Sequence, residues 1–369
     1  MANRVNVPNL ILAQHVLNKM ATAANHYVED ETGEALVGVV VPAETPGDKP
    51  TIYILETIAP DDSAERDTYA FKQGDERQDE LIWWFDSNWN MQREKQRDGE
   101  GKPQPARWDV PLRHLGDWHR QPGYMVAPSD GDLYTALDML ADHDNQFEFL
   151  VAPIVTLHHP ATVSPSDHPV NYLTVDNKDN TCTRVDFWYI DHDSRMFSPI
   201  SPTVQPDDQL PSLVQPPWHL IHEDRFDSEL AQLKADGLFT SVLIWDTDGR
   251  LPLEICLMCA RVGSSKMLVI TTDWDYPNSQ PRAYVGPFPS MQQGEVIYDV
   301  FERLWPQVER VSDPPGWTWN RDSYLVDYIH AVEKALGLPS KPANSQPATT
   351  PSSDSQPGVA ESTSSKDED

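Results

Sequence analysis

The sequence predicts an α/β domain followed by an α+β domain, with a disordered tail at the C-terminus. The chain has 369 residues, enough for two ordinary domains that each bury a core of their own. A hydrophobic fraction of 39%, with 12 Trp and 12 Tyr, is typical of a globular protein. From composition and periodicity we expect domains at 5–195 and 221–339, a Pro-rich linker at 196–220 and a disordered Ser/Pro-rich tail at 340–369.

The first domain begins with apolar residues at helical spacing, which predict an amphipathic helix at 9–24. The apolar run that follows Gly33 indicates a buried strand, entered by a turn that contains Glu31. Further along, the pattern predicts a strand at 51–56, a helix with a buried aromatic face at 80–92, a charged surface loop at 94–105, a strand at 114–119, a helix at 133–141, and strands at 147–157 and 184–190.

The pattern of the second domain predicts one helix, several strands and a final helix. The final helix places Leu325, Ile329 and Val332 on one face and ends at Gly337. In order, we expect a helix at 225–234, strands at 239–245, 251–259 and 266–272, an extended stretch at 282–285, and a helix at 324–336.

The chain carries a strong acidic excess, with 58 Asp and Glu residues against 28 Lys and Arg residues and a formal net charge of −30. This charge repels phosphate backbones, so we expect no nucleic-acid partner. The simplest interpretation is a solvated acidic surface, which also tolerates a basic partner or a divalent metal. No apolar run approaches membrane-spanning length and no signal peptide is recognisable, so we expect no membrane association and a cytoplasmic location.

Three cysteines are too few for a disulfide framework, which indicates a reducing compartment. Cys256 and Cys259 have redox or metal spacing, but they lie inside an apolar run without a second such pair. Residues three apart on a strand face opposite sides. We therefore expect buried structural thiols.

The most informative stretch lies between residues 116 and 132. His119 and Gln121 are two residues apart on a predicted strand, so their side chains share a face. Asp132 follows at the start of the next helix, where the helix dipole favours a carboxylate. An imidazole, an oxygen donor and a carboxylate can bind Zn²⁺ and leave a position for water, whose pKa zinc lowers toward ~7. A general base must then come from elsewhere in the chain.

The sequence of this stretch is W-H-x-Q-P. Seven residues separate Gln121 from Ser129, and two more separate Ser129 from Asp132. This pattern closely resembles the JAMM motif of JAB/MPN-domain metallopeptidases, H-x-H-x7-S-x2-D. The family's upstream E-x6-G pattern is matched by Glu31 and Gly38. The resemblance covers about residues 5–195 and implies a cytidine-deaminase-like α/β fold.

The resemblance also implies a function, namely zinc-dependent cleavage of isopeptide or peptide bonds after ubiquitin-like proteins or in their conjugates. The roles it carries over are zinc ligation by His119, Asp132 and Gln121, proton abstraction by Glu31, and donation of a hydrogen bond to the oxyanion by Ser129. Glu34 is a second candidate base, placed behind Glu31 because the family has a small residue at its position.

Gln121 departs from the family, which has histidine there. A glutamine oxygen can ligate zinc, but it is a neutral and harder donor than imidazole, so zinc affinity should fall. His114, expected on the opposite face of the strand from His119, offers no replacement. Three hypotheses stay open: a zinc-dependent (iso)peptidase, a catalytically silent scaffold that binds ubiquitin-like or partner proteins, and a structural protein unrelated to this family.

The second domain is reminiscent of the ubiquitin-conjugating-enzyme and RWD-like fold. The residues that carry this resemblance are the helix at 226–233, the run Asp275-Tyr276-Pro277 with Pro281 after a strand, and the segment from Trp319 into the last helix. No cysteine follows Tyr284, where the thioester nucleophile of the family would belong. The resemblance therefore implies a binding role without conjugating activity.

Overall fold

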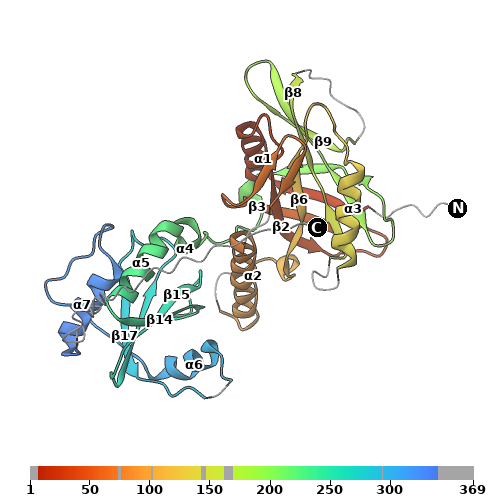
Figure 1. Ribbon diagram of the computed structural model, residues 1–369. Coiled ribbons are helices and arrows are strands. Elements are labelled where there is room, and N and C mark those ends of the chain that lie inside the picture. Colours follow the sequence, from red (N-terminus) through yellow and green to blue (C-terminus); the bar gives the residue numbers. More distant parts are fainter. Residues whose placement is uncertain are drawn as a thin grey trace, which may run out of the picture.

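The computed structural model describes residues 7–73, 76–100, 103–142, 147–161, 169–292 and 294–339 (Figure 1). Within these ranges the chain is a mixed α/β protein, in agreement with the coarse fold class that the sequence predicts. The predicted tail at 340–369 lies outside the described residues. None of the helices in the described ranges has the combined length and hydrophobicity that crossing a bilayer requires.

An eight-stranded mixed sheet dominates the N-terminal part, with the strand order β13-β1-β3-β2-β6-β8-β10-β9. The pairs β13–β1, β1–β3 and β6–β8 are parallel, and the other pairs are antiparallel. The strands are β1 (Asn9–Ala13), β2 (Gly33–Val41), β3 (Thr51–Ile58), β6 (Leu112–Arg120), β8 (Ile154–Pro160), β9 (Tyr172–Asp176), β10 (Thr181–Asp186) and β13 (Pro202–Gln205).

Two small sheets flank the large one and carry residues of the site described below. One has the order β12-β11-β7, and the other is the hairpin β4-β5. Their strands are β4 (Glu65–Asp67), β5 (Ala70–Lys72), β7 (Phe149–Val151), β11 (Trp188–Asp191) and β12 (Ser198–Pro199).

Helices cover the sheet because each buries one apolar stripe. In α1 (Gln14–His26) the buried residues recur three to four positions apart, and the helix contacts β3 and β8. The long helix α2 (Glu76–Arg97) buries Leu81, Trp84, Phe85 and Trp89, which confirms the predicted aromatic face. Helix α3 (Asp130–Ala141) packs Ala136 and Leu140 on β7 and β11. Figure 1 shows α1 and α3 with the strands of the sheet between them.

Some predicted elements differ from the structure. The first half of the helix expected at 9–24 is strand β1, since hydrogen bonding to both β13 and β3 outweighs the helical spacing of its apolar residues. Helix α2 runs on to Arg97, into the segment expected as a loop at 94–105. The strands expected at 147–157 and 184–190 are each split in two, so that β7 and β11 leave the large sheet for a small one.

The segment expected as a linker at 196–220 contributes to the N-terminal sheet. Its residues Pro202–Gln205 form β13, a short edge strand parallel to β1. Proline is tolerated there because an edge strand has one side without a neighbour. Farther on, the short helix α4 (Trp218–Ile221) buries Trp218.

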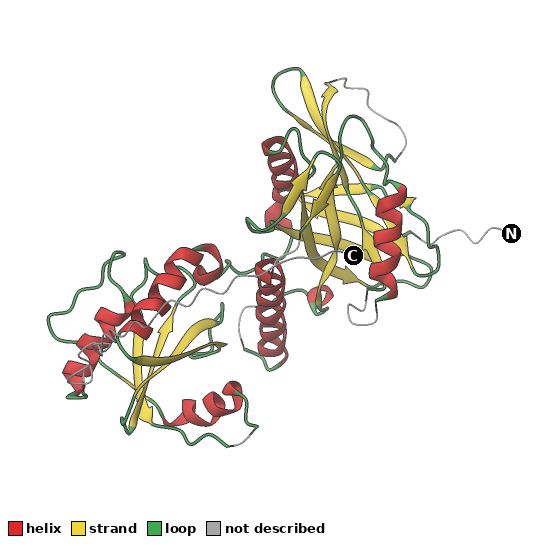
Figure 2. Ribbon diagram, viewed as in Figure 1, coloured by secondary structure: helices red, strands yellow, loops and turns green. Residues whose placement is uncertain are grey.

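The C-terminal part holds a five-stranded antiparallel sheet with the order β14-β15-β16-β17-β18. Figure 2 shows helices on both sides of it. Its strands are β14 (Leu238–Trp245), β15 (Glu254–Arg261), β16 (Lys266–Thr272), β17 (Arg282–Pro287) and β18 (Glu309–Arg310); its helices are α5 (Glu223–Ala235), α6 (Ile297–Leu304) and α7 (Leu325–Leu336). The sequence predicted these elements apart from α6 and β18, and β15 starts later than expected.

The cysteines of this sheet are buried, as expected. Cys256 packs in a core cluster with α6, whereas Cys259 packs in the cluster that contains α5 and α7, so the two thiols lie on opposite faces of β15. Burial raises the pKa of Cys259 to about 12. Both thiols are therefore protonated and inert at neutral pH.

Candidate metal centre

Two elements bring His119 and Asp132 together. His119 lies near the end of the central strand β6, and Asp132 lies in the first turn of α3. The start of α3 is fixed by a capping box, in which Ser129 Oγ accepts from Asp132 N at 3.2 Å and Asp132 Oδ2 accepts from Ser129 N at 2.6 Å. The Asp132 carboxylate is thus held by its own helix terminus, which leaves Oδ1 directed at His119 Nε2 at 3.4 Å.

Gln121 completes a compact group of three side chains. Its Nε2 donates to Asp132 Oδ2 at 2.9 Å and lies 3.2 Å from His119 Nε2. Burial lowers the pKa of His119, against the opposing charge of Asp132, so the ring is neutral and its Nε2 can accept a proton or bind a metal. Gln121 is only 3% exposed, and its Oε1 is buried without a hydrogen-bond partner.

His119, Gln121 and Asp132 offer an imidazole nitrogen, an amide and a carboxylate, which include donor types that zinc accepts. In tetrahedral zinc sites with bonds of about 2.0–2.2 Å, neighbouring ligand atoms lie roughly 3.3–3.6 Å apart. The observed separations are 3.4 Å from His119 Nε2 to Asp132 Oδ1, 3.2 Å from His119 Nε2 to Gln121 Nε2 and 2.9 Å from Gln121 Nε2 to Asp132 Oδ2. The last two involve the amide nitrogen, which does not ligate; rotation of the Gln121 amide by half a turn would exchange it for the unpartnered oxygen. Among the described residues, no group of three or more His, Cys, Asp and Glu side chains is arranged for a metal.

Glu31 enters the site from the turn before β2. It lines the same cavity as His119 and Asp132. Partial burial and the negative charge of Asp132 raise its pKa to about 7, although Arg120 acts in the opposite direction. A carboxylate with that pKa is suited to accept a proton near neutral pH.

Arg120 fixes this turn. It lies between His119 and Gln121 in the chain, yet its guanidinium donates to the carbonyl oxygens of Asp30, at 3.0 Å, and of Val28. Its backbone N–H donates to Thr32 O at 2.7 Å. The strand that carries His119 therefore also holds the segment that carries the candidate base, Glu31.

A bulge at Gly116 reshapes strand β6. Its φ of +121° is a left-handed conformation that favours glycine, and a Cβ atom there would lie 2.5 Å from Val151 O. Because the bulge shifts the alternation, His114 hydrogen-bonds to Asp117, with 2.9 Å between Nε2 and Oδ1, and Asp117 shares the cavity with His119. The sequence placed His114 on the face opposite His119; the bulge brings it against a cavity residue, although not among the candidate ligands.

Gly38, the glycine of the E-x6-G pattern, also lies at a bulge. The register of β2 against β3 shifts between Val37 and Gly38, and a Cβ atom on Gly38 would stand 1.9 Å from Tyr53 O. Only glycine permits this close approach of the two strands. Glu34, the second candidate base, points elsewhere: it is buried, accepts from Thr57 Oγ1 at 2.7 Å and lines a different cavity.

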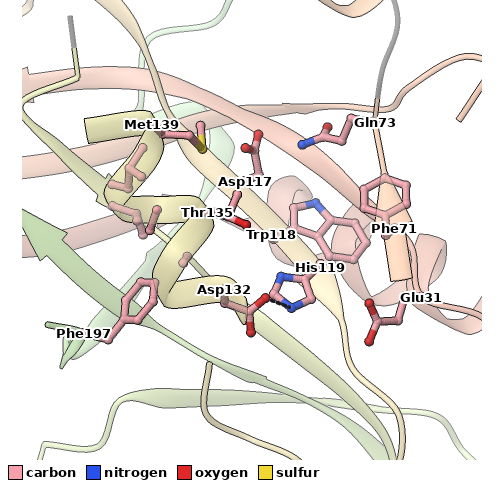
Figure 3. Close-up of a pocket in the computed structure, with 14 residues that line it drawn as sticks. Glu31, Phe71, Gln73, Asp117, Trp118, His119, Asp132, Thr135, Met139 and Phe197 are labelled. Atoms are coloured by element: carbon pink, nitrogen blue, oxygen red, sulfur yellow. Dashed lines mark ion pairs between the residues drawn. The ribbon is translucent and has the colours of Figure 1, made fainter. Parts of the chain in front are cut away.

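The cavity beside the candidate metal centre has a volume of about 310 Å³ (Figure 3). Glu31, His119 and Asp132 line it, whereas Gln121 and Ser129 do not. Sequence reasoning missed its other lining residues, most of which come from β5, α3 and the small sheets: Phe71, Gln73, Thr135, Met139 and Phe197, together with Asp117 of β6. Asp117 could have been found, because it precedes His119 by two residues on one strand.

Comparisons with known proteins add little. No family model and no curated protein matches the chain. Among solved structures, the solution structure of protein DSY2949 from Desulfitobacterium hafniense matches with 12% sequence identity and a TM-score of 0.26, over 53% of this chain and 93% of that one. At that TM-score the likeness supports no statement about fold or function.

Proposed function

We propose that the N-terminal part is a JAB/MPN-type domain and acts as a zinc-dependent (iso)peptidase on ubiquitin-like proteins or their conjugates. The observation that carries this proposal is the convergence of Glu31, His119 and Asp132 on one cavity, from three separate elements. The catalytic motif of the family requires these three side chains to lie close together. A chance similarity in sequence would not bring them together in the structure. The organisation into the domains 5–195 and 221–339 is part of the proposal.

In the proposed reaction, His119, Asp132 and Gln121 would hold a zinc ion, which would supply a Lewis acid and lower the pKa of a bound water. Glu31 takes a proton from the attacking water and then passes it to the leaving amine, and a pKa of about 7 suits both transfers. The Ser129 hydroxyl is the donor proposed for the oxyanion, held in place by the capping box of α3.

Exposed apolar side chains near the lining residues in sequence support a protein as substrate. Large apolar side chains are exposed next to the lining residues in sequence: Tyr69 near Phe71, Tyr134 beside Thr135, and Met196 beside Phe197. Tyr124 and Met125 are exposed in the loop between Gln121 and Ser129. Exposed aromatic and Met residues of this kind are enriched where proteins bind one another.

The second candidate function is a silent scaffold that binds ubiquitin-like or partner proteins. The observation that favours it is the hydrogen bonding of Gln121 to Asp132 and His119, which satisfies part of the site without a metal. The C-terminal part, proposed as conjugating-enzyme-like, would contribute binding only, because each described cysteine is buried.

The test is cleavage of linear and isopeptide-linked ubiquitin-like fusions, followed by intact-mass spectrometry. The peptidase proposal expects products with the wild type and none after Asp132→Ala or zinc chelation. Fusions that bind without being cleaved would support the scaffold instead.

A further inference from the structure

The cavity beside the candidate metal centre extends beyond the groups that the proposed reaction uses. Glu31, His119 and Asp132 lie at one end, and Asp117 lies at the other, between Met139 and Gln73 (Figure 3). The far end therefore has a carboxylate of its own that no proposed step employs.

Apolar side chains line much of the cavity. Phe71 comes from the β4-β5 hairpin, Met139 from α3, and Phe197 from the segment between β11 and β12; Trp118 of β6 and Leu150 and Val151 of β7, which are buried, also line it. With 310 Å³, the cavity has room for an unbranched chain of four or five heavy atoms. An aliphatic stem would bury its methylene groups against these walls.

The charges of the cavity select the end group of such a chain. The lining includes three carboxylates, Glu31, Asp117 and Asp132, and no Lys or Arg among the described residues. Asp117 pairs with His114, whose Nε2 lies 2.9 Å from Oδ1, and also accepts a hydrogen bond from the Gln73 side chain. A carboxylate has about four acceptor positions, so about two are left for a ligand. The Asp117 side chain is 26% exposed, so a ligand can reach it.

We propose that this cavity is a subsite for a lysine or arginine side chain, with the aliphatic stem between Phe71, Met139 and Phe197 and the cationic head at Asp117. The substrate role rests on the proposed peptidase function: the substrate class becomes ubiquitin-like proteins or conjugates with a basic residue flanking the scissile bond. The binding of an aliphatic cation does not depend on catalysis.

The test measures binding of n-butylammonium, a mimic of the lysine side chain, to the full chain in zinc-free buffer at low salt and pH 8. Methyl NMR of Met139 reports occupancy, and 1-butanol is the neutral counterpart of the probe. We expect n-butylammonium to bind about tenfold more tightly than 1-butanol, since a charge-assisted hydrogen bond contributes that much. Asp117→Asn should remove the difference, whereas Asp138→Asn, an exposed acid on the same helix as Met139, should leave it.

A second pair of variants keeps the test decisive if Asp117→Asn fails to fold. Thr135 lines the cavity but is exposed, so it tolerates replacement. Thr135→Lys places a competing ammonium group at the cavity and should abolish n-butylammonium binding, whereas Thr135→Gln should retain it. Equal binding of the two probes by the wild type, or unchanged binding in Thr135→Lys, would overturn the proposal.

This outcome is separable from that of the peptidase proposal. Selective binding of n-butylammonium in a protein that cleaves no fusion would refute the peptidase and leave the cationic subsite standing. In a protein that does cleave, kcat/KM should favour Lys over Met beside the scissile bond, and Asp117→Asn should remove that preference.

Discussion

Two buried polar clusters of this chain differ in how completely they are paired. In the C-terminal part, Arg261 donates to Asp236 at 2.6 Å and to Glu333 at 2.5 and 2.9 Å, and His330 also contacts Asp236. Burial alone would raise the pKa of Asp236, but hydrogen bonds from Arg261 and His330 bring it below its usual value. These contacts join the end of α5 to β15 and α7, so this cluster is structural.

The group around His119 is paired only in part. Gln121 Oε1 and Arg120 Nε are buried without a partner, and burial shifts the pKa of Glu31 upward and that of His119 downward. Such groups cost folding free energy and are retained where a ligand or a reaction uses them. The two clusters therefore differ in pairing: the cluster around Arg261 is saturated, whereas the group around His119 keeps an unpaired amide oxygen and lies beside a cavity.

The largest effect is expected from Glu31→Gln. Removal of a general base should lower the rate of fusion cleavage by roughly 10²–10⁴-fold, because the amide cannot accept the proton. Zinc content and the melting temperature should stay near those of the wild type. Cleavage at the wild-type rate would show that another group is the base.

Arg261→Met should affect stability rather than the site. Removing one partner of a buried ion pair leaves Asp236 and Glu333 uncompensated and should cost about 3–5 kcal/mol. Urea unfolding measures this, with Arg97→Met as the control, since the pair of Arg97 with Asp109 is exposed, is screened by solvent and should contribute little. A loss of zinc binding in folded Arg261→Met would contradict the division into structural and functional clusters.

Gln121→His should strengthen zinc binding by about tenfold or more, because imidazole is a better zinc donor than a neutral amide. Competition with a zinc-chelating dye measures the affinity. Gln121→Leu is the matched control without a donor and should weaken binding. Unchanged affinity in Gln121→His would place this side chain outside the coordination sphere.

The pH dependence should be governed by Glu31. Glu31 acts as a base only when it is deprotonated, so activity should rise with pH through about 7. This rise, the acidic limb of the pH–activity profile, should be absent in Glu31→Gln. Since the folded-state pKa is raised, the folded protein binds this proton more tightly than the unfolded chain. The corresponding stability is present below the usual carboxyl pKa and is lost as pH rises to about 7.

The smallest effect is expected from Arg120→Met. Arg120 lowers the pKa of Glu31, so the variant should move the acidic limb to higher pH, and release of the turn at Val28 and Asp30 should reduce kcat. Arg120→Lys keeps the charge and should retain the position of the limb. An unchanged pH profile in Arg120→Met would show that the turn is held by other contacts.

Much of the fold followed from local periodicity. The aromatic stripe of α2 and the strands 239–245 and 266–272 lie where their patterns placed them. The failures have a common cause, since β1 and β13 exist through pairing with distant strands, which local spacing does not encode.

The site was predictable to the extent that its residues are close in sequence. The spacing from His119 to Asp132 placed both at one strand end and helix start, as observed. The bulge at Gly116, the Arg120 contacts and the walls formed by Phe71 and Phe197 depend on chain segments that meet only in the folded protein.

The most direct test is elemental analysis of zinc in the purified chain after dialysis without chelator, beside Asp132→Ala and Gln121→His. A zinc centre predicts near-stoichiometric zinc in the wild type, its loss in Asp132→Ala and its retention in Gln121→His. Zinc absent from the wild type but gained by Gln121→His would contradict a working centre and identify a silenced one.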